Sequence, residues 1–387
     1  MIQSNFMEKL LDGVQVEWKT LGEVAKIQRG ASPRPIAKYI TADEDGVPWI
    51  KIGDTVPNSK YVSQTEQKIT HEGAIKSRVL KKGDFIMSNS MSFGRPYILN
   101  IDGAIHDGWA SISDFENNLN SNFLYHYLSS NLVQNYWISR INSGSVSNLN
   151  SDIIKSLEIP ILPLKVQEEI VRILDTFTEL TAELTAELTA RKKQYTYYRD
   201  KLLSFEEGEV EWKTLGSVVE IQRGKRLVKS ELETLGKYAV FQNSMVPLGY
   251  YHKSNVKANT TFIISAGAAG EIGYSNVDFW AADDVYFFLN NNKIKSKYLY
   301  YFLLTQKTKI SSQVRRASVP RLSKMVVEKL IIPIPPLLEQ ERIVSILDKF
   351  DSLTSSITGG LPREIELRQK QYEYYRNMLL SFSKQEV

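Results

Sequence analysis

The chain has 387 residues, of which 42% are hydrophobic and none is cysteine, so a disulfide scaffold, thiolate metal sites and a cysteine nucleophile are excluded. No run approaches the ~18 apolar residues of a membrane span, and Glu8 and Lys9 stand where a signal peptide would be apolar, so we expect a cytoplasmic protein without membrane contact. The formal charge is only +4, so nucleic-acid binding must be judged from where the charges lie.

Three blocks of the sequence occur twice. VEWKTLGEVAKIQRG, from Val16, returns as VEWKTLGSVVEIQRG from Val210, with twelve identities in fifteen positions. The other two blocks, IPILPLKVQEEIVRILDTF and RKKQYTYYRDKLLSF, begin at Ile159 and Arg191 and return as IPIPPLLEQERIVSILDKF and RQKQYEYYRNMLLSF from Ile332 and Arg368. The segments between the blocks are largely unrelated. The sequence therefore predicts an internal repeat in which two similar frames hold two different inserts.

The repeat divides the chain into four predicted segments. Strand-rich variable segments are expected over residues 1–158 and 206–331, and helical segments over 159–205 and 332–387. β-Branched and aromatic runs such as 85–87 and 261–264 predict strands, and one helix is expected near the end of each variable segment, at 121–138 and 296–313. The predicted fold class is α+β, with two mixed, strand-rich domains separated by long helices.

The helical segments carry an apolar seam with alternating steps of three and four, as in a coiled coil. In the first copy the seam comprises Ile170, Ile173, Phe177, Leu180 and Leu184, and it continues from Arg191 through Tyr195, Tyr198, Leu202 and Phe205. Between these stretches the step of four from Leu184 to Leu188 is a stutter, which locally unwinds a supercoil. No Gly or Pro interrupts residues 164–205, which predicts one helix of ~60 Å at ~1.5 Å per residue. In the second copy, Gly359 to Pro362 should break the helix. We expect the two helices to form an antiparallel coiled coil, with the tyrosines serving as packing residues rather than stacking on bases.

A four-residue repeat lies within the first long helix. TAEL occurs in tandem from Thr181 to Leu188, after a partial copy at 178–180. One more unit would lengthen a helix by ~6 Å and rotate the chain beyond it by about 40°. B-DNA advances ~3.4 Å and turns about 35° per base pair. A helix built in such steps could keep two DNA-reading domains in register while changing their separation; the alternative is an accident of a helical linker.

The sequence shows no recognisable catalytic motif. The four histidines, His71, His106, His126 and His252, are scattered without ligand spacing, and we expect no metal site. The glycines of 267–273 are interpreted as turn residues, and Asp283-Asp284 as a strand or turn feature rather than a metal site. We therefore expect no catalytic residues in this chain.

Basic and small polar residues gather in loops at matching places of the two copies. Arginine bidentate to guanine is the commonest specific base contact, and serine and asparagine bond both bases and backbone. The candidate DNA-binding residues are Arg29, Ser32, Arg34, Asn89, Ser92, Arg95, Ser143, Ser145 and Asn148 in the first copy, and Arg223, Lys225, Arg226, Arg315, Arg316, Ser318 and Arg321 in the second.

With these repeated blocks and its TAEL units, the chain resembles the specificity subunit of type I restriction–modification systems. The TAEL spacer and the C-terminal LPREIELRQKQYEYYR point to the type IC branch. The resemblance implies two target recognition domains joined by two conserved helical regions with pseudo-twofold symmetry. Each domain would read one half of a split, asymmetric site in double-stranded DNA.

The resemblance also implies partners. Two methylation subunits would bind this chain and transfer a methyl group from S-adenosylmethionine to adenine N6, and restriction subunits would add ATP- and magnesium-dependent translocation and cleavage. No cofactor would be bound by this chain itself. Two other interpretations stay open at this point: an unrecognised DNA-modifying enzyme, and a helical scaffold without DNA readout.

Overall fold

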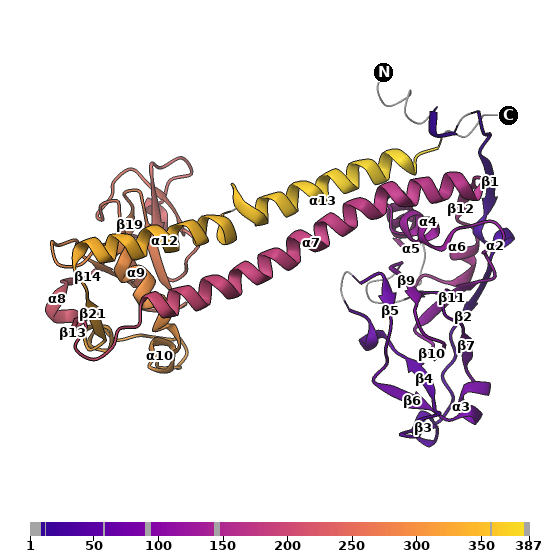
Figure 1. Ribbon diagram of the computed structural model, residues 1–387, viewed down its shortest axis with the longest axis horizontal. Coiled ribbons are helices and arrows are strands. Elements are labelled where there is room, and N and C mark those ends of the chain that lie inside the picture. The colour runs from indigo at the N-terminus through magenta and orange to yellow at the C-terminus, as the bar shows by residue number, and fades with distance from the viewer. Residues whose placement is uncertain are drawn as a thin grey trace. The chain divides into compact units, whose positions relative to one another are not determined.

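The computed structural model describes residues 9–11, 13–56, 59–89, 94–142, 148–356 and 358–382. The chain folds as two compact units: unit 1 is Met1–Glu183 with Glu366–Val387, and unit 2 is Leu184–Ile365. Helix α7 (Leu164–Leu202) is continuous and gives its first half to unit 1 and its second half to unit 2 (Figure 1).

Unit 1 holds two five-stranded sheets and one two-stranded ribbon. The first sheet has the order β2 (Lys26–Arg29), β11 (Trp109–Ser113), β8 (Phe85–Ser88), β9 (Pro96–Leu99) and β5 (Tyr61–Val62). The second has the order β3 (Ile40–Thr41), β6 (Gln67–Ile69), β4 (Val47–Ile50), β10 (Gly103–Ile105) and β7 (Arg78–Leu80). The ribbon pairs β1 (Glu17–Thr20) with β12 (Glu158–Ile161). The expected strand at 85–87 is confirmed as the fully buried β8.

Unit 2 repeats this arrangement with fewer strands in each of its two larger sheets. One sheet has the order β14 (Ile221–Arg223), β20 (Val285–Phe288), β17 (Thr260–Ile264) and β18 (Ile272–Ser275). The other has the order β16 (Gly249–Tyr251), β15 (Tyr238–Phe241) and β19 (Trp280–Ala281), and a ribbon pairs β13 (Glu211–Thr214) with β21 (Ile331–Ile334). Trp212 pairs with Pro333 just as Trp18 pairs with Pro160, so the sequence repeat is a structural repeat with the same register.

The helices of unit 1 before α7 are α2 (Leu21–Val24), α3 (His71–Ile75), α4 (Ser121–Leu128), α5 (Asn131–Asn142) and α6 (Ser151–Lys155), with 3₁₀ turns at Ile36–Lys38 and Ile52–Asp54. The single helix expected over 121–138 is therefore wrong. The chain breaks after Leu128 because Ser130 caps α5, its Oγ accepting from the Val133 amide at 3.4 Å. Gln134 Nε2 then donates to the freed carbonyl of Leu128 at 2.7 Å.

The helices of unit 2 are α8 (Leu215–Val218), α9 (Ser296–Thr305), α10 (Lys307–Ser312), α11 (Lys324–Glu328) and α12 (Leu337–Ser355), with a 3₁₀ turn at Lys229–Glu231. The single helix expected over 296–313 is also split, at Gln306. The expected break in the second long helical segment is confirmed, since α12 ends at Ser355 and α13 spans Gly360–Leu379. Among the helices of the described residues, none is both long and apolar enough to cross a membrane.

Each unit pairs one half of α7 with a C-terminal helix running in the opposite direction. In unit 1, where α13 runs alongside α7 (Figure 1), Phe177 of α7 stacks on Tyr375 of α13 at 5.0 Å between ring centroids. In unit 2, Phe350 of α12 stacks on Tyr198 of α7 at 5.6 Å. These are equivalent positions of the repeated blocks, so the antiparallel pairing is made in the same way twice.

The burial pattern of α7 differs from the predicted seam around its middle. Leu180 is 39% exposed, whereas Thr181, Leu184 and Leu188 are partly buried. The less exposed face thus passes from Phe177 to Thr181, Leu184 and Leu188, in steps of four, three and four residues, which keep it on one side of the helix. The helix also ends at Leu202, earlier than expected.

A buried glutamine fastens each long helix to its own unit. Gln167, fully buried, accepts from the Asn120 amide and donates to the carbonyls of Asn118 and Leu162, each at 2.8 Å. Its equivalent, Gln340, accepts from the Lys295 amide at 2.8 Å and likewise donates to two backbone carbonyls. Each side chain thus forms hydrogen bonds with three backbone groups that would otherwise be buried without a partner.

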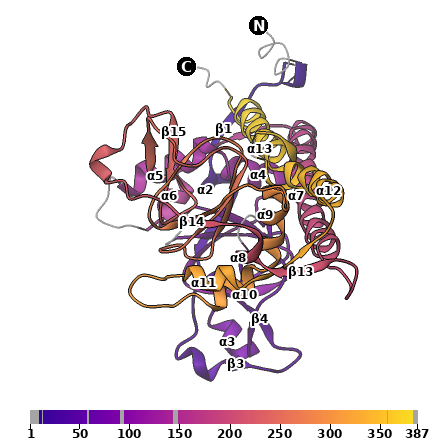
Figure 2. The same cartoon turned by 90° about the vertical axis from the view of Figure 1, so that its left-hand side faces the viewer.

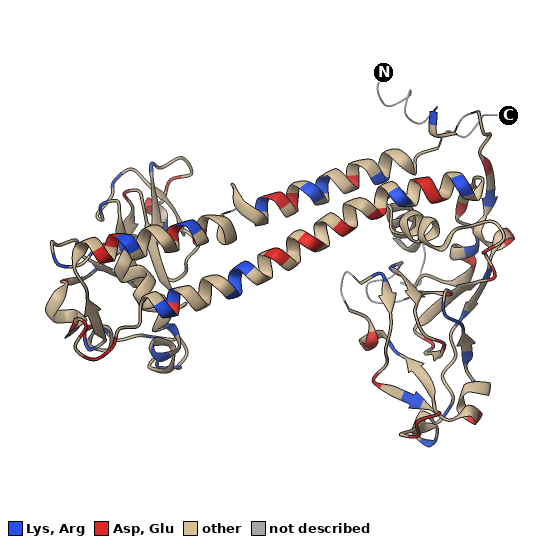
Figure 3. Ribbon diagram, viewed as in Figure 1, with Lys and Arg blue, Asp and Glu red and all other residues tan. Residues whose placement is uncertain are grey.

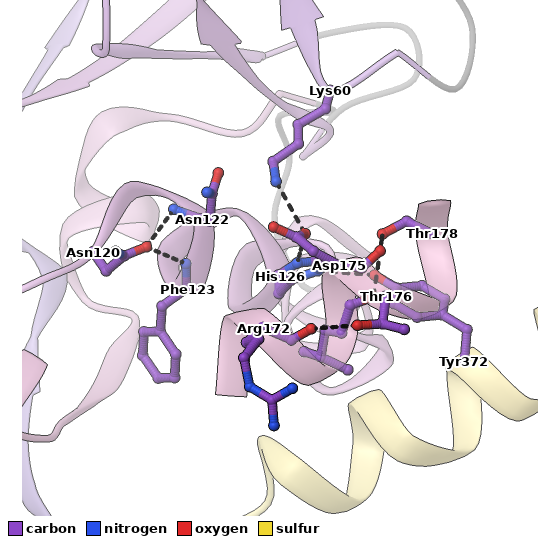
Figure 4. A network of polar contacts seen from close by, with 11 residues as sticks. Lys60, Asn120, Asn122, Phe123, His126, Arg172, Asp175, Thr176, Thr178 and Tyr372 are labelled. Carbon is purple, nitrogen blue, oxygen red and sulfur yellow. Dashed lines mark hydrogen bonds and ion pairs between the residues drawn. The ribbon is translucent and has the colours of Figure 1, made fainter. Parts of the chain in front are cut away.

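A buried polar network joins α4, α7 and α13 in unit 1 (Figure 4). His126, with no exposed surface, bonds Asp175 Oδ1 through Nε2 at 2.8 Å and the Tyr372 hydroxyl through Nδ1 at 2.9 Å, and Lys60 pairs with the same carboxylate at 3.3 Å. Since an ionised carboxylate only accepts, Nε2 carries the proton and Nδ1 accepts from the tyrosine. Burial lowers the pKa of His126, although the hydrogen bond to Asp175 opposes the shift.

Candidate nucleic-acid interface

An arginine at the end of an equivalent strand is held in the same way in each unit. Arg29 ends β2 and its Nε donates to the backbone carbonyl of Asp107 at 3.1 Å. Arg223 ends β14 and its Nε donates to the backbone carbonyl of Asp283 at 2.5 Å. Both side chains are exposed, and within the described residues their Nη groups have no hydrogen bond or ion pair. Each arginine therefore offers an oriented, unoccupied pair of donors.

The glycine after each arginine brings its loop against the neighbouring strand. Gly30 donates to the Trp109 carbonyl at 2.8 Å and Gly224 to the Val285 carbonyl at 2.9 Å. A Cβ at either glycine would overlap a backbone carbonyl oxygen of the adjacent turn, so only glycine allows this approach. The QRG blocks of the sequence are thus pinned beside the turns that contain the two aspartates.

In unit 1, two further predicted residues contact the carboxylate of Asp107. Ser32 Oγ donates to Asp107 Oδ1 at 2.8 Å, and the guanidinium of Arg34 lies 3.7 Å from Oδ2. His106 Nε2 also lies 3.1 Å from Oδ1. The hydrogen bond from Ser32 is the largest cause that holds the pKa of Asp107 below its usual range. The carboxylate is therefore ionised at neutral pH.

Asn89 reaches the same turn from a different strand. Its Nδ2 donates to the backbone carbonyl of Asp107 at 3.2 Å, and the backbone carbonyl of Asn89 accepts from the Leu149 amide at 2.9 Å. The exposed Asn148 is therefore next to this group in the chain, whereas Arg95, partly buried, lies with its guanidinium 5.4 Å from the Tyr97 ring centroid. The structure thus brings together four predicted residues, Arg29, Ser32, Arg34 and Asn89. Ser92, Ser143 and Ser145 lie outside the described residues.

In unit 2 the predicted arginine-rich loop is a small hairpin. Arg315 and Arg321 exchange backbone hydrogen bonds at 2.9 and 3.1 Å, and the loop that joins α10 to α11 can be followed in Figure 2. Arg316 and Ser318 lie between them, and all four side chains are exposed. Within the part of the chain that the structure describes, none of the three guanidinium groups has a hydrogen-bond or ion-pair partner.

The hairpin is tied to the turn that holds Arg223. The Leu322 amide donates to the Ser265 carbonyl at 2.8 Å, and the Ser265 amide donates to the Asp284 carbonyl at 2.7 Å. Asp283 and Asp284 form a turn, as expected. Lys225 and Arg226 come directly after this arginine with exposed side chains, while the Lys225 backbone is fixed by bonds to Ala281 and Trp280. The predicted residues of the second copy therefore share one connected set of loops.

Sequence reasoning missed Asp107 and Asp283 as parts of this arrangement. Both come after a short strand, β10 or β19, and precede the strand that pairs with the arginine strand. The only local signal is an aspartate shortly after a short apolar run. Within the described residues, no group of three His, Asp or Glu side chains is placed to hold a metal ion.

Comparison with known proteins gives one family. The model of the type I restriction modification DNA specificity domain matches residues 14–191 and 207–367. The specificity subunit of the type I restriction enzyme EcoR124I/EcoR124II of Escherichia coli is 34% identical, and the match covers 100% of this chain and 99% of that protein. A putative type I restriction enzyme specificity subunit of Haemophilus influenzae is also 34% identical, with 98% of both chains covered.

Solved structures share the fold. The S subunit of a type I restriction–modification system from M. genitalium superposes with a TM-score of 0.59 at 18% identity, covering 96% of this chain and 98% of that one. A chain from a study of the assembly and conformational transition of a type I system gives a TM-score of 0.63 at 16% identity, covering 95% and 98%.

Proposed function

This chain belongs to the type I restriction–modification DNA specificity family, and on that premise we propose that it is the specificity subunit of a type I restriction–modification complex. Each unit reads one half of a bipartite site in double-stranded DNA. The observation that carries the proposal is the pair of arginines, Arg29 and Arg223, which are held in the same way by a backbone carbonyl and whose Nη donors have no partner among the described residues. Such a fork fits the O6 and N7 acceptors of guanine in the major groove.

The loops around the two arginines account for different half-sites. Unit 1 surrounds Arg29 with serine, asparagine and the carboxylate of Asp107, whereas unit 2 surrounds Arg223 with the exposed hairpin arginines and Arg226. Because base readout depends on the donors and acceptors presented, similar frames with different loops read different sequences. The hairpin of unit 2 adds contacts to phosphates or guanines.

Helix α7 sets the spacing between the two half-sites. It is continuous across its TAEL units, and its residues are shared between both units. The charged residues of the TAEL stretch are all acidic, at Glu179, Glu183 and Glu187 (Figure 3). An acidic helix repels phosphates, which supports a spacing role rather than a DNA-gripping one. The TAEL units support assigning the chain to a type IC-like branch.

The chemistry belongs to the partners. Two methylation subunits dock on this chain and use S-adenosylmethionine to methylate adenine N6, after flipping the base from the duplex. Restriction subunits supply ATP- and magnesium-dependent cleavage in the full complex. This chain contributes no catalytic residue; its part is to select the DNA to which the methylation subunits are delivered.

Mapping N6-methyladenine across a genome tests the proposal. Cells that express this chain with its methylation subunit are compared with cells that express the methylation subunit alone. We expect a two-part motif with a fixed gap only when this chain is present. Methylation that persists without it, or a well-formed complex that yields no motif, would reject the specificity role. Methyl transfer by the purified chain alone would favour an unrecognised enzyme instead.

A further inference from the structure

Asp107 is an acidic residue in the middle of the basic reading face of unit 1. Its carboxylate lies beside Ser32 and Arg34, two of the candidate DNA-binding residues. An ionised carboxylate at such a place repels phosphates, so it weakens the sequence-independent part of DNA binding. Its contacts must therefore contribute something other than affinity.

The side chain and backbone of Asp107 clasp Ser32. Ser32 Oγ donates to the carboxylate at 2.8 Å, and the Asp107 amide lies 3.3 Å from the same hydroxyl, which accepts from it. His106 also lies close to the carboxylate, with Nε2 3.1 Å from Oδ1, and its Nδ1 accepts from the Gly108 amide at 2.9 Å. The loop after Arg29 is thus tied to the turn between β10 and β11.

The same residue orients two further donors through its backbone carbonyl. Arg29 Nε and Asn89 Nδ2 both donate to this oxygen, at 3.1 and 3.2 Å. These two donors and Ser32 belong to different strands or loops, and Asp107 is the group that they share. A guanidinium bound through Nε has its plane fixed, which leaves the Nη edge in a defined direction for a base.

Unit 2 has the carbonyl contact but not the carboxylate contacts. Asp283 holds Arg223 through its backbone oxygen, yet its Oδ1 is buried without a hydrogen-bond partner in the described residues. The position equivalent to Ser32 is Arg226, which is exposed. The clasp by the carboxylate is therefore particular to unit 1, and its effect should be confined to the half-site that unit 1 reads.

We propose that Asp107 is a positioning residue for base recognition by unit 1. Its carboxylate fixes Ser32 and the turn, and the turn fixes Arg29 and Asn89 toward the bases. The inference rests on the proposed function and adds to it a specificity-determining residue that itself does not touch DNA. It predicts that neutralising the carboxylate improves binding to DNA in general while it impairs discrimination at one half-site.

The test uses Asp107→Ala in the full chain, assembled with its methylation subunits; this substitution removes both the negative charge and the oxygen that accepts from Ser32. Binding is measured to the mapped duplex, to duplexes with single base changes in each half, and to a duplex without the site. We expect discrimination at one half-site to fall about fivefold or more, because Arg29 and Asn89 would no longer be directed toward their bases. Affinity for the duplex without the site should rise by about twofold or more at low salt, because one negative charge is removed.

Controls separate positioning from folding. Arg29→Ala identifies which half-site unit 1 reads, and Asp152→Ala, which removes an exposed carboxylate of the same unit, should leave discrimination unchanged. Ser32→Ala removes the same hydrogen bond from its other side and should affect the same half-site, so it carries the test if Asp107→Ala does not assemble. A misfolded unit would lose affinity for every duplex, whereas the proposal requires a gain for DNA without the site.

Two results would overturn the inference. One is unchanged discrimination at both half-sites in both variants; the other is an equal loss at both halves, which indicates a general structural role. A wild-type complex with no bipartite preference would instead reject the proposed function, and this inference with it.

Discussion

The buried amide of Gln167 is predicted to hold the start of α7 to unit 1. Replacing it with leucine keeps the volume similar but leaves the Asn120 amide and the carbonyls of Asn118 and Leu162 without partners. A buried backbone group without a partner costs ~1–3 kcal/mol. The side chain is fully buried, so water cannot replace it in place. Allowing for partial relaxation, we expect the free energy of unfolding of unit 1 to fall by about 3–5 kcal/mol.

Urea denaturation monitored by tryptophan fluorescence measures this loss. Unit 1 holds four of the six tryptophans, Trp18, Trp49, Trp109 and Trp137, so the signal reports mainly on its unfolding. Gln64→Leu, at an exposed position of the same unit, is the matched control and should change the midpoint little.

The equivalent change in unit 2 extends the test. Gln340→Leu should destabilise unit 2 by a similar amount, because its amide also makes three bonds to backbone groups. A loss below about 1 kcal/mol for both variants would contradict this prediction, since it would mean that the three bonds add nothing beyond those made with water.

Three further predictions concern the TAEL units, the arginine hairpin and the buried histidine. Deleting Thr185–Leu188 shortens α7 by ~6 Å and rotates its C-terminal part by about 40°; methylation maps should show a shorter gap between unchanged half-sites, and a changed half-site would contradict this. Replacing Arg315 and Arg316 with alanine removes two exposed guanidinium groups that have no partner within the described residues; DNA affinity should fall and the slope of log K against log salt should become shallower by about 1–2, whereas an unchanged slope would exclude the hairpin as a phosphate contact. Burial lowers the pKa of His126 in the folded chain. As the pH falls through about 6.5, this histidine therefore binds a proton in the unfolded chain before it does so in the folded chain. The free energy of unfolding should therefore be highest above that pH and decline as the pH falls toward 5; in His126→Asn this part of the pH dependence should disappear, and a wild-type profile flat between pH 5 and 7.5 would disprove the coupling.

The repeated blocks made the frame of the fold predictable. Because VEWKT and the IPI strand recur together, their pairing in one copy implies the same pairing in the other, and Trp18 and Trp212 occupy equivalent places in the two ribbons. The break at Gly359 was likewise predictable, since glycine and proline disfavour helix interiors. Local chemistry and repetition were sufficient for these features.

Tertiary contacts decided the features that the sequence did not reveal. The helix expected over 121–138 splits because Ser130 caps the second helix and Gln134 donates to the carbonyl of Leu128. The spacing of apolar residues in the sequence does not indicate either contact. Leu180 turns outward because the neighbours of α7 determine which face is covered. Asp107 is invisible in the sequence as a site residue, since its partners Ser32 and Asn89 lie 75 and 18 positions away.

The central claim is that the two units read the two halves of one DNA site independently. The most direct measurement is to map N6-methyladenine for complexes that contain Arg29→Ala or Arg223→Ala, beside the wild-type complex. Each substitution should relax one half of the motif, the two substitutions should affect opposite halves, and the gap should stay unchanged. Relaxation of the same half by both variants, or of neither half, would contradict the claim.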